Sequence, residues 1–458
     1  MSTKYEVILF QPYLRKFVLN FGNNLRRFTF YNTSNPPILG GGYHKLPTFE
    51  MEILRTKSSW QSHLRRIIGI PNIRPYFKNR GDLLFTYGCL LLTWKPYCVY
   101  IETGVALYNY DLKIAKNPVA RFIVGFLATR STCKQLIFVS EAAKKSFFSS
   151  VHYGKSICDS LQQKSVVIYP IPIEQQGATE AKRFMGQIKL LFPGTFYMKG
   201  GLEVVRAYEK LRKSHDNISL TVVTALHMLR DQDIKHMQSL PGLTILDAKL
   251  NEKQMAEMYR SHDLLLLPTY REGFGLVLVE ALSYAMPIII TDQYATGEMI
   301  QEGINGFSYP NPLRDYDTRS FQMFGRYHDP KAFYKELFSL QNSGKLSPIE
   351  DFLVNSVEKF IKDPSLLERQ SRASLALYSQ KFDSKKLSEK IEEVFLKSVT
   401  RGTKSSLTDL IVNNRGEAAA LGLSRACRDT SLLRGDIQAV KGGIGKICRK
   451  HLRVEKLP

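Results

Sequence analysis

Two glutamates, Glu272 and Glu280, lie in one short segment whose pattern of apolar residues and glycines is that of a ligand-binding loop. They flank a glycine loop that follows an apolar strand and opens an apolar helix near Leu276. Ligands of open α/β sheets bind beyond the carboxyl ends of the strands, where this loop must lie. Gly273 and Gly275 allow the backbone to approach a ligand closely, and the free N–H groups at the helix start favour phosphate. The segment therefore predicts a site for a phosphate-bearing ligand.

Glu280 is the unusual residue of this predicted helix, because its neighbours from Leu276 to Leu282 are otherwise apolar. Burying a carboxylate without a partner is costly, so Glu280 should accept a hydrogen bond. Ribose hydroxyls are natural donors to it. A structural glutamate that caps a backbone group or pairs with a lysine explains the same residue, and the spacing alone leaves both interpretations open.

A second element, Leu190–Glu203, has the pattern of a strand, a turn at Gly194 and a Lys-Gly-Gly entry into a helix. Lys199 beside a helix start can neutralise a diphosphate as a point charge. A lysine before a glycine turn is more often simply solvated, so this motif alone carries little weight.

The elements that must position these residues follow a repeated strand-then-helix order, which predicts parallel sheets covered by helices. In the first half, the predicted helices begin at Asn117-Pro118 and at Ser140, a good N-cap residue. The strands predicted there are Tyr5–Phe10, Leu83–Thr86, Tyr97–Ile101, Gln135–Val139 and Ser165–Tyr169.

One polar stretch near the middle of the chain has no regularly spaced apolar residues. Such a stretch predicts a boundary between two Rossmann-like domains. The basic C-terminal tail has weak periodicity and is expected either to be disordered or to fold only against a partner. The predicted division is a first domain over 1–175, a linker over 176–186, a second domain over 187–345, C-terminal helices over 346–400 and the tail over 401–458.

The net charge of +22 indicates an anionic partner without naming it, since nucleic acid, an anionic membrane and small phosphate compounds all fit. The 6 cysteines form no CxxC pair and have no histidine at metal-ligand spacing, so we expect free thiols rather than a zinc site or disulfides. Apolar runs are too short to span a bilayer, and the first residues lack the features of a secretory signal. A cytoplasmic protein is expected.

Together, the Lys-Gly-Gly motif and the EGFGLVLVEAL run, in which seven residues separate Glu272 from Glu280, resemble the retaining GT-B glycosyltransferases of family 4, or glycosyl transferases group 1. The resemblance covers roughly Tyr97 to Phe307 well and extends loosely to about Val399. Further segments that resemble the family in its usual order are Phe138–Ala143, Val167–Pro170, Pro287–Thr291, Gly297-Glu298 and Asn305–Phe307.

This resemblance implies the GT-B fold, in which two Rossmann-like domains face each other across a cleft, followed by C-terminal helices. It implies transfer of a sugar from a nucleotide-diphosphate sugar to a saccharide or lipid-linked acceptor with retention of configuration, as in a hexosyltransferase of cell-surface polysaccharide or glycolipid synthesis. The acceptor would enter from the first domain, and neither a metal nor another cofactor is expected.

By the same resemblance, Glu272 and Lys199 would be catalytic, since catalysis rests largely on stabilising the departing diphosphate. Glu272 would contact the transferred sugar, Lys199 the diphosphate and Glu280 the ribose. The donor-binding residues implied are Gly194, Thr195, Lys199, Glu272, Gly273, Phe274, Gly275, Leu276 and Glu280.

The sequence departs from the family pattern at two places. Thr195 follows Gly194 where the family often has an arginine that helps to hold phosphate, and Glu102 stands in the region where the first domain often has a histidine. No catalytic residue is therefore assigned to the first domain. His44 could approach the cleft, although a lone histidine is more often structural or solvated.

The basic charge leads to one further hypothesis, peripheral attachment to the cytoplasmic face of an anionic membrane. A solvated surface with ordinary core residues explains the same pattern, and both interpretations stay open. The candidate contacts are Arg65, Arg66, Arg74, Lys78 and Arg80, with Trp60, Ile67, Ile68, Ile70, Tyr76 and Phe77.

Three rival functions also remain: a nucleotide-sugar epimerase of the same architecture, an inactive glycosyltransferase-like partner subunit, and a nucleic-acid-binding module. The Glu272/Glu280 pair disfavours the epimerase, whereas Thr195 and Glu102 keep the inactive subunit open. Nucleic acid is not an expected partner, because the sequence has no zinc-finger spacing and no aromatic RNA-binding motif.

Overall fold

A computed structural model describes residues 5–10, 25, 27–32, 70–172, 177–178, 180–327 and 330–400. Several sequence predictions lie outside the described residues. They are His44, Trp60, Arg65, Arg66, Ile67, Ile68 and the tail over 401–458.

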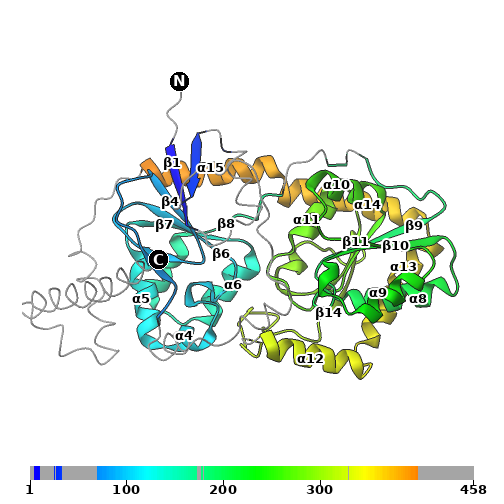
Figure 1. The fold of residues 1–458 in the computed structure, drawn as a ribbon. Coiled ribbons are helices and arrows are strands. Elements are labelled where there is room, and N and C mark those ends of the chain that lie inside the picture. The colour runs from blue at the N-terminus through cyan, green and yellow to red at the C-terminus, as the bar shows by residue number, and fades with distance from the viewer. Residues whose placement is uncertain are drawn as a thin grey trace, which may run out of the picture. The chain divides into compact units, whose positions relative to one another are not determined.

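The first lobe is built on a parallel sheet of 6 strands, in the order β2-β1-β4-β6-β7-β8 (Figure 1). The interior strands consist almost entirely of buried apolar residues, as is typical of a sheet covered on both faces. The strand bounds are β1 (Tyr5–Phe10), β2 (Phe28–Asn32), β4 (Leu83–Tyr87), β6 (Tyr97–Ile101), β7 (Cys133–Phe138) and β8 (Ser165–Val167).

The helices of this lobe begin where the sequence supplies capping residues. The Asn117 side chain accepts hydrogen bonds from the amides of Val119 and Ala120, and that of Ser140 accepts one from the Ala143 amide. Both predicted helix starts are thus confirmed. The helices are α4 (Leu112–Lys116), α5 (Pro118–Thr129), α6 (Glu141–Ser150) and α7 (Lys155–Gln163).

The apolar run Leu83–Trp94 contains one predicted strand. In the structure it forms two strands. The chain turns at Gly88, whose φ of 59° is in the left-handed region that glycine adopts without strain. The second strand, β5 (Leu90–Leu92), pairs in parallel with β3 (Ile73–Pro75) in a separate small sheet. Neither strand of this sheet was predicted from the sequence.

The second lobe contains another parallel sheet of 6 strands, in the order β11-β10-β9-β12-β13-β14. In chain order this is 3-2-1-4-5-6, the order of dinucleotide-binding sheets, whose ligand crevice lies where the order reverses, here between β9 and β12. The bounds are β9 (Ile188–Pro193), β10 (Ile218–Thr224), β11 (Leu243–Asp247), β12 (Leu264–Leu267), β13 (Ile288–Asp292) and β14 (Gly306–Pro310).

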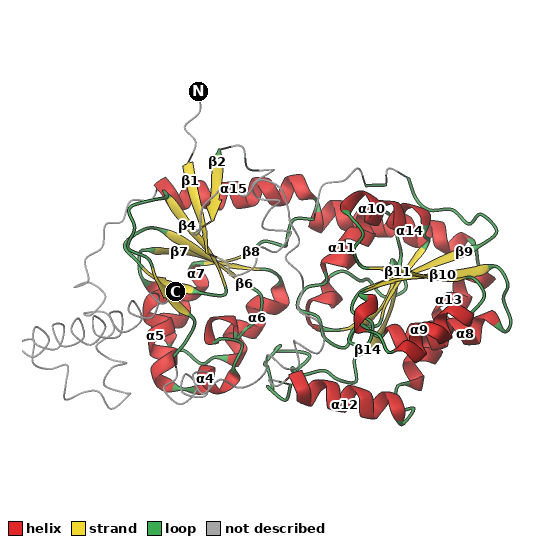
Figure 2. Ribbon diagram, in the orientation of Figure 1, coloured by secondary structure: helices red, strands yellow, loops and turns green. Residues whose placement is uncertain are grey.

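Helices cover this second sheet as well (Figure 2). A short 3₁₀ segment, η3 (Tyr294–Glu298), follows β13, and a π-helical turn, η4 (Tyr378–Phe382), precedes the last helix. The helices are α8 (Gly201–Arg212), α9 (Asp231–Ser239), α10 (Glu252–Ser261), α11 (Leu276–Ser283), α12 (Pro330–Asn342), α13 (Ser347–Lys362), α14 (Ser365–Leu377) and α15 (Ser384–Thr400).

The helices after residue 346 pack on different lobes. Helix α13 packs on α8, whereas α15 returns to the first sheet and contacts β4, β6 and β7 (Figure 1). The Phe395 ring of α15 lies 5.6 Å from that of Phe28 and 5.3 Å from that of Phe85. The last helix therefore completes the core of the first lobe.

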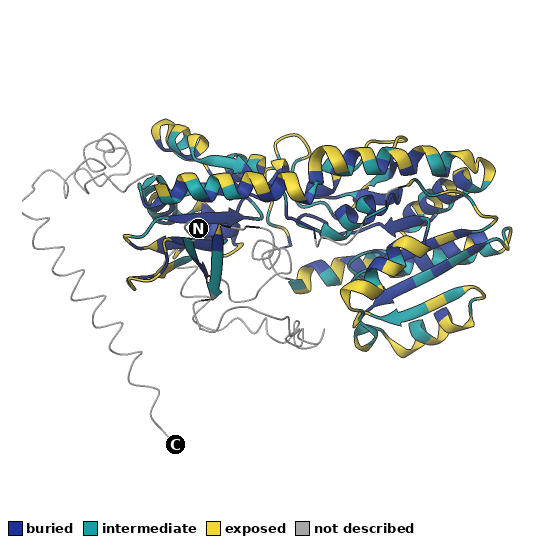
Figure 3. Cartoon of the chain, turned by 90° about the horizontal axis from the view of Figure 1, so that it is seen from above, coloured by how far each residue is buried: buried dark blue, intermediate teal, exposed yellow. Residues whose placement is uncertain are grey.

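Buried residues are concentrated in the strands, and exposed residues in the outer faces of the helices (Figure 3). The predicted α/β class, with two Rossmann-like sheets and C-terminal helices, is confirmed. In the part of the chain that is described, no helix is long and apolar enough to cross a membrane.

Candidate functional site

Lys199 and Glu272 form an ion pair at the crevice between β9 and β12. Lys199 belongs to the loop after β9 and Glu272 to the loop after β12, and Lys199 Nζ lies 2.6 Å from Glu272 Oε2. Lys199 Nζ also donates to the Arg271 carbonyl oxygen at 2.7 Å. The side chains are only 13% and 21% exposed. The structure thus brings together the two residues that the sequence singled out as catalytic.

The Glu272 carboxylate is held in its ionised form. Burial opposes ionisation, but the Lys199 ammonium and hydrogen bonds from the Gly273 and Phe274 amides outweigh burial and lower the pKa of Glu272. The Gly273 amide donates to Glu272 Oε1 at 3.0 Å. A fixed negative charge at this position can accept hydrogen bonds from hydroxyl groups.

Glycines shape the turn that carries Lys199. The Lys199 amide donates to the Thr195 carbonyl oxygen at 2.9 Å. A Cβ at Gly194 would lie 3.1 Å from Lys199 Cγ, and one at Gly200 would lie 2.4 Å from the Pro268 carbonyl oxygen. The two loops can approach this closely only because these positions lack side chains.

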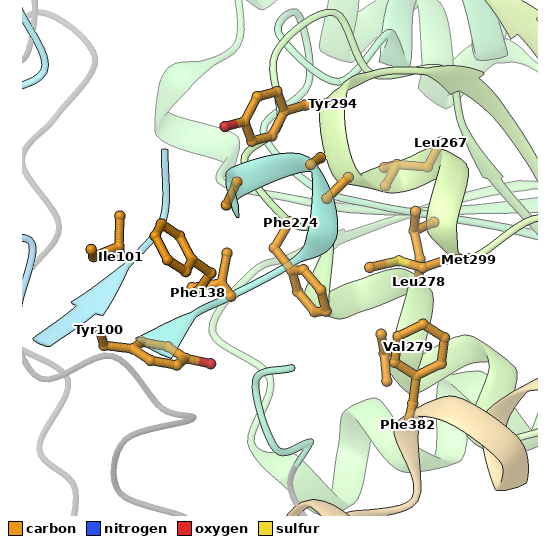
Figure 4. Packing of buried hydrophobic residues seen from close by; sticks show 14 of the residues in the cluster. Tyr100, Ile101, Phe138, Leu267, Phe274, Leu278, Val279, Tyr294, Met299 and Phe382 are labelled. Atoms are coloured by element: carbon orange, nitrogen blue, oxygen red, sulfur yellow. The ribbon is translucent and has the colours of Figure 1, made fainter. Parts of the chain in front are cut away.

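Helix α11 begins at Leu276, as predicted, and directs its first amides toward the same crevice. Gly275, the residue before it, has a φ of 97°, which again favours glycine. Phe274 is buried among the core residues drawn in Figure 4. Its ring lies 5.9 Å from that of Tyr169. Phe274 can therefore contribute its backbone to a ligand, while its side chain belongs to the core.

Glu280 is partly buried and has a protein partner. The hydroxyl of Tyr259, a buried residue on α10, donates to Glu280 Oε2 at 2.7 Å. The expectation that this carboxylate accepts a hydrogen bond is confirmed. Tyr259 is a partner that the sequence did not single out, and the interpretation of Glu280 as a ribose ligand stays a prediction.

The first lobe contributes Glu102, which lies directly after β6. Tyr87 donates a hydrogen bond from its hydroxyl to Glu102 Oε2. A Cβ at Gly273 would lie 2.7 Å from Glu102 Oε1, so this carboxylate meets the loop that carries Glu272. Sequence reasoning identified Glu102 only as a departure from the family pattern. Its position at the carboxyl end of a parallel strand was the signal that could have identified it.

A cavity of about 330 Å³ adjoins Glu272 and Glu102, near the lower end of the range for small-molecule sites. Its lining comes from both lobes and from the chain between β14 and α12. The lining residues are Glu102, Thr103, Val105, Asn109, Tyr110, Leu112, Tyr270, Arg271, Glu272, Gly273, Gln293, Tyr294, Leu313, Asp315, Tyr316, Met323, Gly325, Tyr327 and Phe333.

Glu298, at the end of η3 in the second lobe, binds the N-terminus of α6 in the first. Its carboxylate accepts from the Ala142 amide at 2.8 Å, the Glu141 amide at 3.1 Å and the Tyr169 hydroxyl at 2.9 Å. A carboxylate at a helix N-terminus also interacts favourably with the helix dipole. Glu298 therefore links the two lobes close to the cavity.

No group of three or more histidine, cysteine, aspartate or glutamate residues in the described ranges is arranged to hold a metal ion. Cys89, Cys98, Cys133 and Cys158 are free thiols, as expected. Burial raises the pKa of Cys89 and of Cys98 to about 12, so these two thiols are protonated and unreactive at neutral pH. The other two cysteines lie outside the described residues.

The proposed membrane contacts separate into core and surface residues. Tyr76 is buried against Phe10, so its assignment to a membrane surface was wrong. Phe77 is 51% exposed and packs on Trp94, which is 56% exposed. Trp94 was not among the predicted contacts, because it is distant from the basic segment in sequence.

Solved structures identify the fold that these two lobes define. The chain is similar to HepE of Anabaena, solved with UDP and glucose, with a TM-score of 0.52, 12% identity and coverage of 86% of this chain and 100% of the other. It is also similar to sucrose-phosphate synthase of Thermosynechococcus elongatus, with a TM-score of 0.53, 12% identity and coverage of 86% and 99%. The chain has the GT-B fold of the glycosyltransferases.

The match to a protein family falls in the second lobe. Residues 178–317 match the model of the family Glycosyl transferases group 1, and this range contains Lys199, Glu272 and Glu280. A D-inositol 3-phosphate glycosyltransferase of Arthrobacter sp. strain FB24 is 32% identical over 127 residues, which cover 26% of this chain but only 30% of that protein. The capsular polysaccharide biosynthesis glycosyltransferase CapM of Staphylococcus aureus is 20% identical over 264 residues, or 55% and 67% of the two chains.

Proposed function

We propose that this protein is a retaining glycosyltransferase that moves a sugar from a nucleotide-diphosphate sugar to a hydroxyl of a saccharide or lipid-linked acceptor. The observation that carries the proposal is the Lys199–Glu272 ion pair at the crevice between β9 and β12. The match of residues 178–317 to a glycosyltransferase family supports it. The partial similarity to CapM favours a role in polysaccharide synthesis.

The proposed donor lies against the second lobe. Its diphosphate interacts with Lys199 and with the free amides at the start of α11 near Leu276, which together supply positive charge without a metal. Its sugar hydroxyls donate to Glu272, whose ionised carboxylate can only accept. Its ribose binds near Glu280, whose carboxylate Tyr259 already orients.

Retention requires the diphosphate to leave from the face of the sugar on which the acceptor hydroxyl arrives. Negative charge grows on the diphosphate as the glycosidic bond breaks. Preorganised positive groups lower the barrier most effectively when they are directed at such developing charge. Lys199 is preorganised in this sense, since the Arg271 carbonyl oxygen and Glu272 fix its ammonium group.

Thermal stabilisation by UDP, GDP, ADP and CDP, with a chelator present, tests the donor site. We expect one nucleotide to raise the melting temperature of the wild type and to have little effect on Lys199→Ala and Glu280→Ala. Lys249→Ala is a matched control, because this lysine of the same lobe has a side chain that is 85% exposed. Stabilisation by no nucleotide would contradict the proposal.

Product analysis then separates the transferase from its rivals. Incubation with the sugar nucleotide that corresponds to the preferred nucleotide should yield free nucleoside diphosphate, and this yield should increase when an acceptor is added. An epimerase would instead convert the sugar nucleotide without acceptor and release no diphosphate. A subunit without activity would bind the nucleotide and leave its sugar form unchanged.

We also propose peripheral attachment of the first lobe to an anionic membrane on the cytoplasmic side. The exposed Phe77–Trp94 pair supports this proposal, because Phe77 lies between Arg74 and Arg80 in the sequence. Flotation with vesicles that contain anionic lipid should be lost at high salt and reduced by Trp94→Ala. Equal binding to neutral vesicles would refute it.

A further inference from the structure

The cavity beside Glu272 extends away from the residues assigned to the donor diphosphate. Glu272 and Gly273 line it, whereas Lys199 and Glu280 are not among its lining residues. The remainder of the lining comes from the first lobe, from second-lobe residues after β12 and β13 and in α12, and from the 311–327 loop, the segment that joins β14 to α12. The cavity therefore has a donor end at Glu272 and a further portion that none of the donor residues accounts for.

The 311–327 loop is anchored to the second lobe by buried and partly exposed polar contacts. Asn311 Nδ2 donates to the Tyr270 carbonyl oxygen at 3.0 Å. Arg314 binds the Asp292 carboxylate at 2.9 Å, and the Tyr294 amide donates to the Tyr316 hydroxyl. These anchors fix the loop beside the carboxyl ends of β12 and β13.

The tip of the same loop rests on the first lobe. The Met323 amide donates to Ser150 Oγ, at the end of α6, at 2.9 Å. Gly325, with a φ of 76°, lies so close to α4 that a Cβ there would be 3.1 Å from Leu112 Cδ2. The loop thus extends from one lobe to the other and completes the wall of the cavity.

Backbone strain is concentrated around this cavity. In the described part of the chain, 5 residues other than glycine have positive φ. Asn109, Tyr110 and Tyr294 line the cavity, and Phe321 belongs to the loop, where its ring stacks on Tyr316. Such conformations cost about 1–3 kcal/mol each and are concentrated where ligands bind.

The lining has the chemistry of a site for uncharged hydroxyl-rich groups. Three carboxylates, those of Glu102, Glu272 and Asp315, line the cavity, and the one cation among the lining residues is Arg271, which lies over the Phe333 ring. Lys199 pairs with Glu272 and Arg326 with Asp315 from outside the lining, so the carboxylates face the cavity while their counter-charges lie behind them. Carboxylates accept hydrogen bonds from hydroxyl groups and repel anions. Aromatic rings give apolar surfaces for the C–H faces of a sugar, and they come from Tyr110, Tyr270, Tyr294, Tyr316, Tyr327 and Phe333.

We propose that the cavity binds the acceptor as an uncharged saccharide unit, that the 311–327 loop determines this specificity, and that the carboxylates exclude acceptors with phosphate or carboxylate groups near the reacting hydroxyl. This inference rests on the proposed transferase function. The proposed acceptor is uncharged, whereas the inositol phosphate in the name of the Arthrobacter relative is anionic.

Saturation-transfer NMR on the full-length protein tests the inference. The probes are neutral methyl glycosides and the corresponding sugar 6-phosphates, added with the nucleoside diphosphate that stabilises the protein most, or without nucleotide if none does. Gly325→Val displaces the loop tip from Leu112. Gly344→Val is the matched control, because Gly344 has a φ of 69° and no atom within 4 Å of its Cβ position. Met323→Ser is a milder variant in case Gly325→Val does not fold.

We expect neutral glycosides to bind and 6-phosphates not to bind. Gly325→Val should weaken glycoside binding by about ten-fold, equivalent to ~1.4 kcal/mol, and Gly344→Val should not. Nucleotide stabilisation should be equal in all variants. Binding of the phosphates, absence of glycoside binding, or full binding by both loop variants would overturn the inference. A parallel loss of nucleotide affinity in Gly325→Val would also overturn it, by assigning the cavity to the donor. Failure of every nucleotide to stabilise the wild type would count against the transferase instead.

Discussion

Replacing Lys199 by methionine tests the electrostatic basis of the site. The substitution keeps most of the side-chain volume but leaves the Glu272 carboxylate without its counter-charge. Glu272 would retain the Gly273 and Phe274 amides as donors. Burial, the largest single influence on this carboxyl group, would then raise its pKa. We therefore expect the variant to be less stable wherever Glu272 is ionised.

The expected loss follows from the burial of the pair. Removing one partner of a buried ion pair costs about 3–5 kcal/mol, and the side chains here are 13% and 21% exposed, which favours the lower end. In the wild type the lowered pKa stabilises the folded state above about pH 4.3, the pKa of an unfolded glutamate. That stabilisation is lost as the pH falls through the folded-state pKa. The free energy of unfolding of the variant should be about 3 kcal/mol lower than that of the wild type near neutral pH, and this difference should shrink below about pH 4.

Urea unfolding at neutral and acidic pH measures this difference. Lys397→Met is the matched control, because Lys397 pairs with Glu393 on an exposed helix face, where an ion pair contributes little to stability. Adding Glu272→Gln to Lys199→Met should recover part of the loss, since the buried charge is then gone. Equal losses for Lys199→Met and Lys397→Met, or a loss independent of pH, would refute the reasoning.

Three further predictions concern single residues. Glu298→Ala removes the acceptor for two α6 amides and one tyrosine hydroxyl and should cost about 1–3 kcal/mol in urea unfolding; a loss below experimental error would exclude a stabilising role. Gly306→Ala places a Cβ 1.9 Å from a carbonyl oxygen of β13 and should lower the free energy of unfolding by more than about 2 kcal/mol. Gly303 has a φ of 73° and no atom near its Cβ position, so Gly303→Ala should lower it by about 1 kcal/mol. Equal melting temperatures of the two variants would contradict this prediction. Burial raises the pKa of Glu203 to about 7, so ionisation of this carboxyl group destabilises the folded state. At about pH 8, Glu203→Gln should therefore be more stable than the wild type by on the order of 3 kcal/mol. This gain in stability should disappear toward about pH 4.

Much of the fold was predictable because its signals are local. Ser140 and Asn117 mark helix starts through hydrogen bonds to amides two or three residues away. The apolar strands of parallel sheets also stand out in sequence. The destination of α15 was not predictable, since its amphipathic pattern shows that it packs but not on which lobe. Only the contact of Phe395 with Phe85 decides that, across a long sequence separation.

The candidate site was predictable to a similar degree. Lys199 and Glu272 follow neighbouring strands, and the carboxyl ends of parallel strands meet at one edge, so their proximity followed from the strand order. The roles assigned to Glu272, Lys199 and Glu280 remain predictions. The 311–327 loop has no periodicity, and its contacts with Ser150 and Leu112 depend on how the lobes meet. No local pattern in the sequence indicates how the two lobes meet.

The return of α15 to the first sheet has a consequence for biosynthesis. The strands through β8 leave the ribosome more than two hundred residues before Phe395, which covers Phe28 and Phe85. At ~5–20 residues per second, the apolar face of this sheet waits roughly 10–50 s for its last helix. The lobe that is translated first is therefore the lobe that matures last, and its nascent form presents an apolar surface on which a chaperone can act.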